Sequence, residues 1–379
     1  MISQLNNVFK IIVFLFFIKL CYLGLAFFTN HLQSLAFDPY VNTIKMNDSG
    51  WYEKITNEGY SIITNKRDLG YSEGPNIKQS EWAFFPFYPY ANRFLIGIFD
   101  WNFNQSGFFL AMIFSVTSFL ALYYFCVEYF KDTDQALYTT FLVMAFPFHY
   151  YFSMLYTEAI FFTSMIGCFI AINEKKYFML SILLVPLCLI RPNGIIIVVP
   201  LYLYYLERNN IFDKKSIHWN LLFNKKTILE SLYFLTAPIS FGLYCLYQWH
   251  KTGYYLAFTL AQAGWNKKFM FPFMAFFRHG DIANQINSIY SIVGIIVAIF
   301  AWKKLSISLN ILIWLSILLP LCSGSVISMP RYISVIFPLF IFISSILNTY
   351  KYKNAILVLL LMIQICTYYF WLIRNPLSY

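Results

Sequence analysis

Long apolar segments separated by short polar breaks dominate the chain. The first runs from Val8 to Phe28, and a polar stretch separates it from the others. Those others are 106–127, 136–152, 155–172, 177–191, 193–206, 228–249, 285–302, 306–322, 332–349 and 354–373. A helix that crosses a bilayer needs about 20 mostly apolar residues. The pattern predicts an all-α polytopic membrane protein of about 11 transmembrane helices, folded as one domain over residues 1–379.

The first segment is expected to stay attached as a membrane span. It is longer than the apolar core of a cleavable signal peptide, and no small-residue cleavage site follows it. Lys19 falls near its middle, where a charge costs roughly 2.5–3.5 kcal/mol on insertion scales. We expect Lys19 to turn towards other helices or to snorkel, with a part in ligand binding as the alternative.

Residues 30–105 form the least membrane-like part of the chain and are expected to be a large first loop. They carry eight of the 17 acidic residues: Asp38, Asp48, Glu53, Glu58, Asp68, Glu73, Glu81 and Asp100. Trp51, Tyr52, Ile55 and Tyr60 follow near-helical spacing, which predicts a short amphipathic helix at the membrane surface. The two prolines of the run 83–89 predict a rigid loop without regular helix. Residues 250–284 form a second large loop.

Basic residues mark every second break between the apolar segments. They are Lys131, Lys175 and Lys176, the stretch 208–226, Lys303 and Lys304, and Lys351 and Lys353. Cytoplasmic loops carry an excess of Lys and Arg. The N-terminus is therefore predicted to be cytoplasmic, and the loops 30–105 and 250–284 to lie on the outer face of the cytoplasmic (inner) membrane.

The composition agrees with a lipid bilayer as the main partner. Hydrophobic residues make up 59% of the chain and charged residues 12%, too apolar a balance for an ordinary soluble domain. The net charge of +10 follows from the basic cytoplasmic loops, so no nucleic-acid partner is expected. None of the seven cysteines lies in a CxxC motif, which argues against a disulfide framework or a zinc site.

Asp48 is the first candidate for chemistry, because it stands at the predicted lipid–water boundary beside Trp51 and Tyr52. Transfer of a sugar to an alcohol needs a carboxylate that accepts the hydroxyl proton. The two aromatic faces suit a sugar ring or the head of a lipid. The simpler alternative is a solvated charge or a helix N-cap.

Glu158 and Arg191 both lie at predicted outer ends of apolar segments. An acidic residue at such an edge usually points into protein or a cavity, although it can also cap a helix N-terminus. Arg191 begins the sequence Arg-Pro-Asn-Gly, whose proline interrupts the helix. Binding of a phosphate or carboxylate competes here with a plain ion pair between Glu158 and Arg191.

The second loop and the break at 323–331 add polar and cationic side chains on the same side. They are Gln262, Trp265, Lys267 and Arg331. Positive charge beside a membrane can bind lipid phosphate, and solvated charge is the alternative. The sequence contains no Walker loop, GxGxxG, HExxH or His/Cys metal spacing. No cofactor is therefore assigned, and a divalent cation would have no dedicated ligand cluster.

Taken in order, these motifs resemble those of the PIG-V family, which are GPI mannosyltransferase II-like enzymes, in a bacterial-type form. The resemblance rests on Asp48-Ser49-Gly50-Trp51-Tyr52 with Gly59-Tyr60, on 83–89, on Tyr156-Thr157-Glu158, on 191–194, on Ala261-Gln262 with Trp265, and on Pro330-Arg331-Tyr332 with Phe337-Pro338. It covers roughly residues 45–340. It implies a GT-C type glycosyltransferase, a helical membrane protein whose first extracytoplasmic loop carries the key acid.

The resemblance also implies a reaction. A polyprenyl-phosphate sugar, typically mannose, would be the donor, a lipid, glycan or protein the acceptor, and inversion the usual outcome. By that match Asp48 is the catalytic carboxylate. From charge and side we add Arg191, Lys267 and Arg331 as candidates for the donor phosphate, and Gln262 and Trp265 for the sugar or acceptor pocket. The alternative function is a transporter or flippase of lipid-linked sugars.

Overall fold

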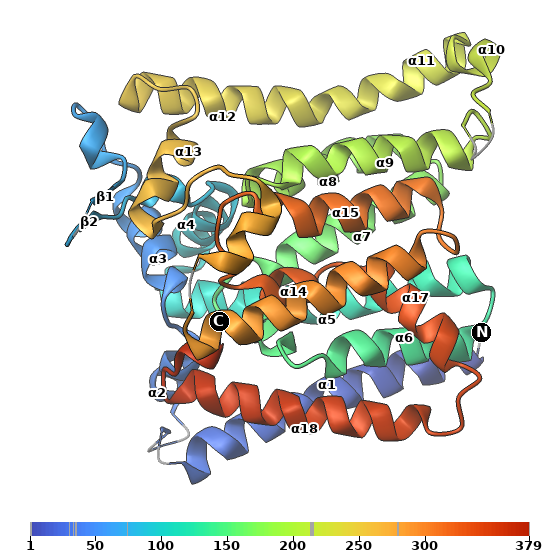
Figure 1. Cartoon of the computed structure of the whole chain (residues 1–379), viewed down its shortest axis with the longest axis horizontal. Coiled ribbons are helices and arrows are strands. Elements are labelled where there is room, and N and C mark those ends of the chain that lie inside the picture. The colour runs from blue at the N-terminus through green and yellow to red at the C-terminus, as the bar shows by residue number, and fades with distance from the viewer. Residues whose placement is uncertain are drawn as a thin grey trace.

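Long helices packed side by side form the body of the computed structural model, which describes residues 2–29, 31–32, 34, 36–73, 75–212, 216–278 and 280–378. They lie roughly parallel and antiparallel to one another (Figure 1). These helices are α1 (Ile2–Phe28), α5 (Phe103–Phe130), α6 (Thr133–Ala145), α7 (Glu158–Asn173), α8 (Tyr177–Ile190), α9 (Gly194–Arg208), α12 (Thr236–Thr252), α14 (Ile282–Ala301), α15 (Ile307–Leu321), α17 (Phe337–Leu347) and α18 (Lys353–Leu372).

The chain is a multi-pass membrane protein by the length and apolar character of its helices. Within the described residues, five helices are long and apolar enough to cross a membrane: 4–28, 103–130, 225–252, 282–301 and 353–372. The span at 225–252 joins α11 (Lys225–Ser231) and η4 (Leu232–Leu235) to α12. Four more apolar helices, α7, α8, α15 and α17, are shorter. The count of about eleven spans stays a prediction.

Two predicted segments are broken where prolines stand. The segment 136–152 was expected to be one helix, but α6 ends at Ala145, just before Pro147, and His149–Ser153 form a 3₁₀ turn, η3. The segment 332–349 is likewise divided. The short helix α16 (Met329–Ser334) precedes α17, which begins at Phe337 with Pro338 in its first turn. Proline has no N–H to donate, so it is best tolerated in the first turn of a helix, although α8 and α9 each hold a proline inside, Pro186 and Pro200.

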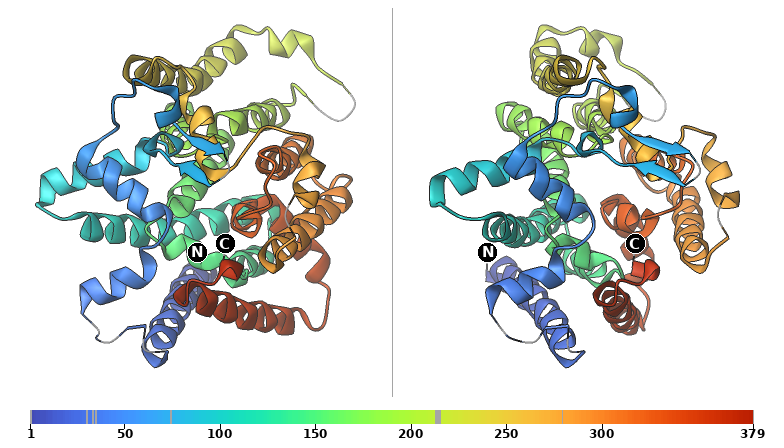
Figure 2. Two further views of the ribbon diagram at one scale, coloured as in Figure 1. Left: turned by 60° about the vertical axis from the view of Figure 1, so that its left-hand side comes forward. Right: turned by 90° about the vertical axis from the view of Figure 1, so that its left-hand side faces the viewer.

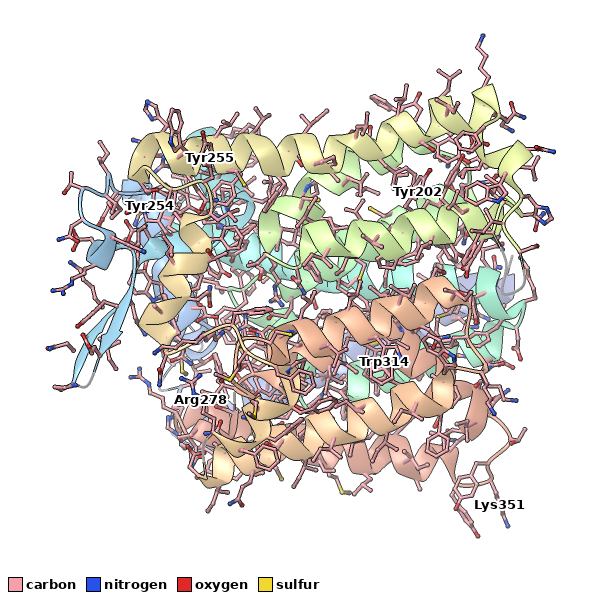
Figure 3. The ribbon with its side chains drawn as sticks, turned by 45° about the horizontal axis from the view of Figure 1, so that its top comes forward. Tyr202, Tyr254, Tyr255, Arg278, Trp314 and Lys351 are labelled. Carbon is pink, nitrogen blue, oxygen red and sulfur yellow. The ribbon has the colours of Figure 1, made fainter. Side chains whose placement is uncertain are left out.

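The two ends of the bundle differ in character. The basic connections between α5 and α6, α7 and α8, α14 and α15, and α17 and α18 all lie at the end where the N-terminus lies (Figure 1). The helix α9 ends there too, with Arg208 in its last turn. Figure 3 shows Lys351 at that end and Tyr254, Tyr255 and Arg278 at the other. This gathering of charge is what the positive-inside rule requires of a cytoplasmic face, and the assignment of that face stays a prediction.

The first loop is structured at the opposite end of the bundle. It contains α2 (Phe37–Ile44), α3 (Asp48–Glu58), the turns η1 (Lys66–Asp68) and η2 (Glu81–Ala83), and α4 (Phe87–Phe99). The short helix expected from the spacing at 51–60 is therefore present as α3. The expectation that 83–89 lacks regular helix is wrong, because α4 begins at Phe87 and Pro89 lies in its first turn. A proline there has no intrahelical hydrogen bond to lose.

A small hairpin adds the only named strands in the described residues. β1 (Tyr71–Glu73) pairs antiparallel with β2 (Asn76–Lys78), and Tyr71 lies opposite Lys78. The hairpin lies beside α13 (Ala257–Ala261) and η5 (Gln262–Trp265) of the second loop in both views of Figure 2. We call α3, the hairpin, η2, α13 and η5 together the cap.

The cap has a hydrophobic core of its own, built from both loops. Ile55, Tyr60, Leu69 and Trp82 of the first loop bury their side chains with Ala257 and Ala261 of the second. Two glycines allow the loops to touch. A Cβ on Gly70 would lie 2.7 Å from the carbonyl oxygen of Ala261, and one on Gly264 would lie 2.4 Å from that of Lys78.

Glu81 is a buried acid that holds the cap together. Its Oε1 accepts a hydrogen bond from the backbone N–H of Ser61 at 3.0 Å and another from the Ser61 hydroxyl. Its Oε2 lies 3.3 Å from the ammonium of Lys54. Burial alone would raise the pKa of Glu81, but the Ser61 hydrogen bonds and Lys54 outweigh it and lower that pKa below its ordinary value of 4.5.

Replacing Gly264 with alanine should separate the two loops. The added methyl would clash with backbone rather than with a flexible side chain, and such overpacking costs about 1–3 kcal/mol. We expect a lower thermal unfolding midpoint for the purified chain in detergent. Gly97→Ala in α4 is the control, because a Cβ there meets nothing within 4 Å. Equal midpoints for the two variants would contradict the close contact.

The contribution of Glu81 to the stability of the folded chain should decrease at low pH. Because its pKa is lowered in the folded chain, ionised Glu81 stabilises the cap above about pH 4.5, and this stability is lost as the pH falls through the folded pKa. The variant Glu81→Gln has no carboxylate to protonate, so its stability should fall less than that of the parent between pH 7 and pH 3. Thermal unfolding from pH 7 to pH 3 measures it, and parallel curves for variant and parent would count against the assignment.

Candidate active site

Asp48 is positioned at the start of α3 by contacts to the 153–157 segment. Its backbone N–H donates to the hydroxyl of Tyr156 at 3.2 Å, and that hydroxyl donates to the carbonyl of Met46 at 2.8 Å. The next residue, Ser49, donates its hydroxyl to the carbonyl of Leu155 at 3.3 Å. Asn47 reaches this position with a left-handed φ of 49°, a conformation that non-glycine residues adopt only where the surroundings impose it.

Arg331 joins Asp48 to a second carboxylate. Its Nη1 lies 2.8 Å from Oδ2 of Asp48, and its Nε donates to Oε1 of Glu158. Arg331 comes from α16, Glu158 from the first turn of α7 and Asp48 from α3. Three segments far apart in the sequence therefore meet at one guanidinium, whose planar fork suits contact with two carboxylates.

Arg191 completes the network from the other side of Glu158. Its Nη2 donates to the same oxygen, Oε1 of Glu158, and its Nε donates to the hydroxyl of Thr157 at 2.9 Å. The tight α8–α9 turn that presents Arg191 requires Gly194, because a Cβ there would lie 1.8 Å from the carbonyl oxygen of Leu187. Of the two alternatives that the sequence left open at Arg191, the ion pair with Glu158 is thus present in the structure.

Burial distinguishes Asp48 from the other members of the network. The side chain of Glu158 is fully buried and those of Arg191 and Arg331 are 9% exposed, whereas that of Asp48 is 29% exposed. Two carboxylates balance two guanidiniums, so no net charge is buried. Among the described residues, Oδ1 of Asp48 has no hydrogen-bond partner. The network therefore presents one free carboxylate oxygen outwards.

Aromatic rings enclose the Arg331 guanidinium. Its carbon lies 4.6 Å from the ring centre of Tyr156 and 5.0 Å from that of Tyr151. Rings at this distance attract a cation. Arg331 is therefore held by contacts with two rings as well as by its two carboxylate partners.

An aromatic wall lies beside Asp48 and is formed by the cap. Trp51 stacks on Phe84 with ring centres 5.8 Å apart, and Trp265 packs edge-on against Trp51 at 5.8 Å and Phe84 at 5.5 Å. The two tryptophans are half-buried. Trp51 and Trp265, predicted separately from two loops, thus belong to one surface.

Tyr52 lies beneath this wall rather than in it. Its ring is buried against Phe84 and Tyr88. Burial raises the pKa of the Tyr52 phenol, with the charge of Asp48 as a further cause. Tyr52 is thus a neutral phenol near neutral pH, and Asp48 is the group beside the wall that can accept a proton.

Unpaired positive charge comes from the second loop. Lys267 is half-buried, and its charge, together with those of Arg331 and Arg191, lowers the pKa of the Tyr332 phenol. Within the described residues no carboxylate pairs with Lys267, whereas Arg191 and Arg331 are both engaged by Glu158. Gln262 is half-buried in η5, and its carbonyl accepts the backbone N–H of Lys267 at 3.2 Å.

The structure therefore gathers the predicted residues into three parts. Asp48, Glu158, Arg191 and Arg331 form the ionic network, Trp51 and Trp265 form the aromatic wall, and Gln262 and Lys267 lie in the loop that carries Trp265. The roles of Tyr151, Thr157 and Tyr332 were not predicted. Thr157 and Tyr332 had a sequence signal as neighbours of Glu158 and Arg331 in the quoted motifs. Tyr151 had none, because its contact depends on the position of Arg331 in the fold.

Lys19 lies apart from this site. Its ammonium donates to the hydroxyl of Ser153 at 2.8 Å, so it turns towards the bundle as expected. His149 is buried nearby and packs against Phe119 and Phe152. The ring of His149 fills this region of the bundle.

Neither a metal site nor a related protein indicates what this site does. In the part of the chain that the structure describes, no group of three or more His, Cys, Asp or Glu side chains could hold a metal ion. No protein-family model matches the sequence, and no curated protein matches it. Function is therefore argued from the network, the wall and the unpaired cations.

Glu158→Ala should be far more destabilising than Asp48→Asn. The first leaves two buried guanidiniums without their shared partner, and breaking such a pair costs about 3–5 kcal/mol. The second weakens a partly exposed pair, whose contribution is about 0–1 kcal/mol. Thermal unfolding of the purified variants in detergent compares them, and a similar loss in both would contradict the assigned difference in burial.

Proposed function

We propose that the chain is a glycosyltransferase that moves a sugar, in the first instance mannose, from a polyprenyl-phosphate donor to an extracytoplasmic acceptor. The acceptor is a glycolipid, glycan or protein hydroxyl. The site would lie on the outer face of the cytoplasmic membrane, with the N-terminus inside. The proposal combines the resemblance to the PIG-V family with the arrangement of the site.

The observation that carries the proposal is the free oxygen of Asp48 beside the aromatic wall. A carboxylate acting as general base must reach the acceptor hydroxyl while its own orientation stays fixed. Arg331 holds Oδ2, and no described residue binds Oδ1 of this partly exposed side chain. The carboxylate is thus oriented by the protein on one side and available to a substrate on the other.

In the proposed step, the acceptor oxygen attacks the anomeric carbon as its proton passes to Asp48. The bond between that carbon and the phosphate oxygen breaks, and polyprenyl phosphate leaves with the electron pair. Attack from the face opposite the phosphate inverts the anomeric centre. The sugar is already activated as its lipid phosphate, so the step needs no nucleotide.

The aromatic wall supplies a surface for the sugar or the acceptor. Trp51, Phe84 and Trp265 present rings in two orientations beside Asp48. Flat C–H faces of a pyranose pack well on such rings, and burial of this apolar area contributes roughly 25 cal/mol per Å². Gln262, at the start of the turn that carries Trp265, adds an amide for hydroxyl groups.

Lys267 is the best candidate for the donor phosphate. All three cations considered, Arg191, Lys267 and Arg331, lie near Tyr332. Arg191 and Arg331 already share Glu158, and Arg331 also holds Asp48, so we propose that these two position the carboxylate. Lys267 has no such partner among the described residues, and its charge is free to attract the phosphate as negative charge develops on the leaving oxygen.

Asp48→Asn should abolish transfer without unfolding the chain. An amide cannot accept the proton, and loss of a general base costs about 10²–10⁴-fold in rate. We would measure transfer of radiolabelled mannose from polyprenyl-phosphate mannose to membrane extracts that contain native acceptors. The control is Glu58→Gln, an exposed acid in the last turn of the same helix, which should transfer like the parent.

Three other outcomes would count against the proposal. Equal transfer by parent and Asp48→Asn would remove Asp48 from the chemistry. Equal loss in Asp48→Asn and Glu58→Gln would indicate a general disturbance of α3. Movement of the labelled donor across liposome membranes with no transfer, unaffected by Asp48→Asn, would support a transporter of lipid-linked sugars.

A further inference from the structure

Residues 267–278 of the second loop, which we call the Phe arm, expose an unusual amount of aromatic surface. Phe269 is 91% exposed, Phe277 86% and Phe271 67%. Phe273 and Met274, in the 3₁₀ segment η6 (Pro272–Phe277), are exposed as well. A contiguous apolar patch of this kind marks a surface that is covered by something else.

The arm is held firmly in this exposed position. The backbone N–H of Lys268 donates to the carbonyl of Ser323 at 3.0 Å, and that of Met270 to the carbonyl of Cys322 at 2.9 Å. The Arg278 guanidinium donates to the carbonyl of Gly324 at 3.2 Å. Ala275 is buried against the bundle. Hydrogen bonds at both ends of the arm and the burial of Ala275 between them thus fix its position. The exposed phenylalanines therefore belong to a segment that is held in place.

Positive charge frames the aromatic patch. Lys267 and Lys268 precede it and Arg278 follows it. Within the described residues, no carboxylate pairs with any of the three. The nearest acid in sequence, Asp281, instead caps α14 by accepting the N–H of Asn284 at 2.7 Å. The arm therefore combines large apolar side chains with uncompensated cations.

The location of the Phe arm indicates what covers its exposed aromatic rings. The arm joins the cap to α14, a candidate membrane span, and η6 packs on α15. Arg278 lies at the end of the bundle opposite Lys351 (Figure 3). An element at the end of membrane helices stands at headgroup depth, where aromatic rings enter the acyl boundary and cations meet phosphates.

We infer that the Phe arm is inserted into the outer leaflet, with Phe269, Phe271 and Phe277 among the acyl chains and Lys268 and Arg278 bound to the phosphates of anionic phospholipids. A second copy that docked through its own Phe arm would not satisfy the unpaired cations, because that surface presents the same positive charges. The inference goes beyond the proposed transfer reaction and does not rest on it.

Reactivity of introduced cysteines tests the insertion. The full chain with Phe277→Cys or Phe269→Cys is reconstituted, one copy per phosphatidylglycerol nanodisc, and treated with a charged maleimide that does not enter lipid. The control is Ile77→Cys on β2, which is 62% exposed on the cap hairpin. Labelling of the parent is subtracted to account for its own thiols. Thermal unfolding of each variant confirms that it is folded.

We expect both arm positions to react at least tenfold more slowly than position 77. Reaction at the rate of position 77 would overturn the inference. Slow reaction that appears only when several copies share one disc would also overturn it, because a neighbouring chain would then cover the arm.

A second measurement tests the bound phosphate. Native mass spectrometry of the detergent-solubilised chain counts phosphatidylglycerol molecules that stay bound in an excess of phosphatidylcholine. We expect the double variant Lys268→Gln, Arg278→Gln to retain fewer than half as many as the parent. Lys66→Gln, an exposed lysine of η1, is the control and should retain the parent number. Equal retention in all three chains would overturn the assignment of the cations to lipid phosphate.

Discussion

A buried guanidinium must be paired, and that requirement at Arg331 organises the end of the bundle that carries the cap. Leaving such a charge unpaired in a water-poor interior costs several kcal/mol, about 3–5 when one partner is removed. Arg331 meets the requirement through Glu158 and Asp48, and Arg191 balances the remaining charge. These four residues cannot separate without leaving a buried charge unpaired. The first turn of α7, the α8–α9 turn, α16 and the start of α3 are therefore held in one arrangement.

The cap depends on this arrangement. Because Asp48 begins α3, fixing its carboxylate also fixes the helix that carries Trp51 and, at its other end, the small core around Ile55. The second loop closes over that core through Gly264 and supplies Trp265 to the wall. The ionic network is thus buried where it needs rigidity and open only at Asp48, where a substrate would enter.

The all-α membrane character could be predicted because membrane segments are recognised by their length and apolar composition, and five helices are long and apolar enough to span a membrane in the described residues. The sequence also singled out Asp48, Glu158, Arg191 and Arg331, since charges beside apolar segments are costly and few. It did not predict that Arg331 contacts Asp48, because 283 residues separate them and no local pattern reports such a distance. The end of α6 at Ala145 and the start of α4 at Phe87 were also missed. Pro147 follows the end of α6, whereas Pro89 lies in the first turn of α4. Whether a proline ends a helix or begins one depends on its position, which composition alone does not reveal.

The central claim is that Arg331 serves the chemistry by holding Asp48, and a double-mutant cycle on transfer rates tests it most directly. The parent, Asp48→Asn, Arg331→Lys and the double variant would be compared at matched expression. If Arg331 acts through Asp48, the two losses are not additive in free energy, and the double variant transfers about as slowly as Asp48→Asn alone. If the losses multiply, Arg331 acts on the substrate independently, and the account is contradicted.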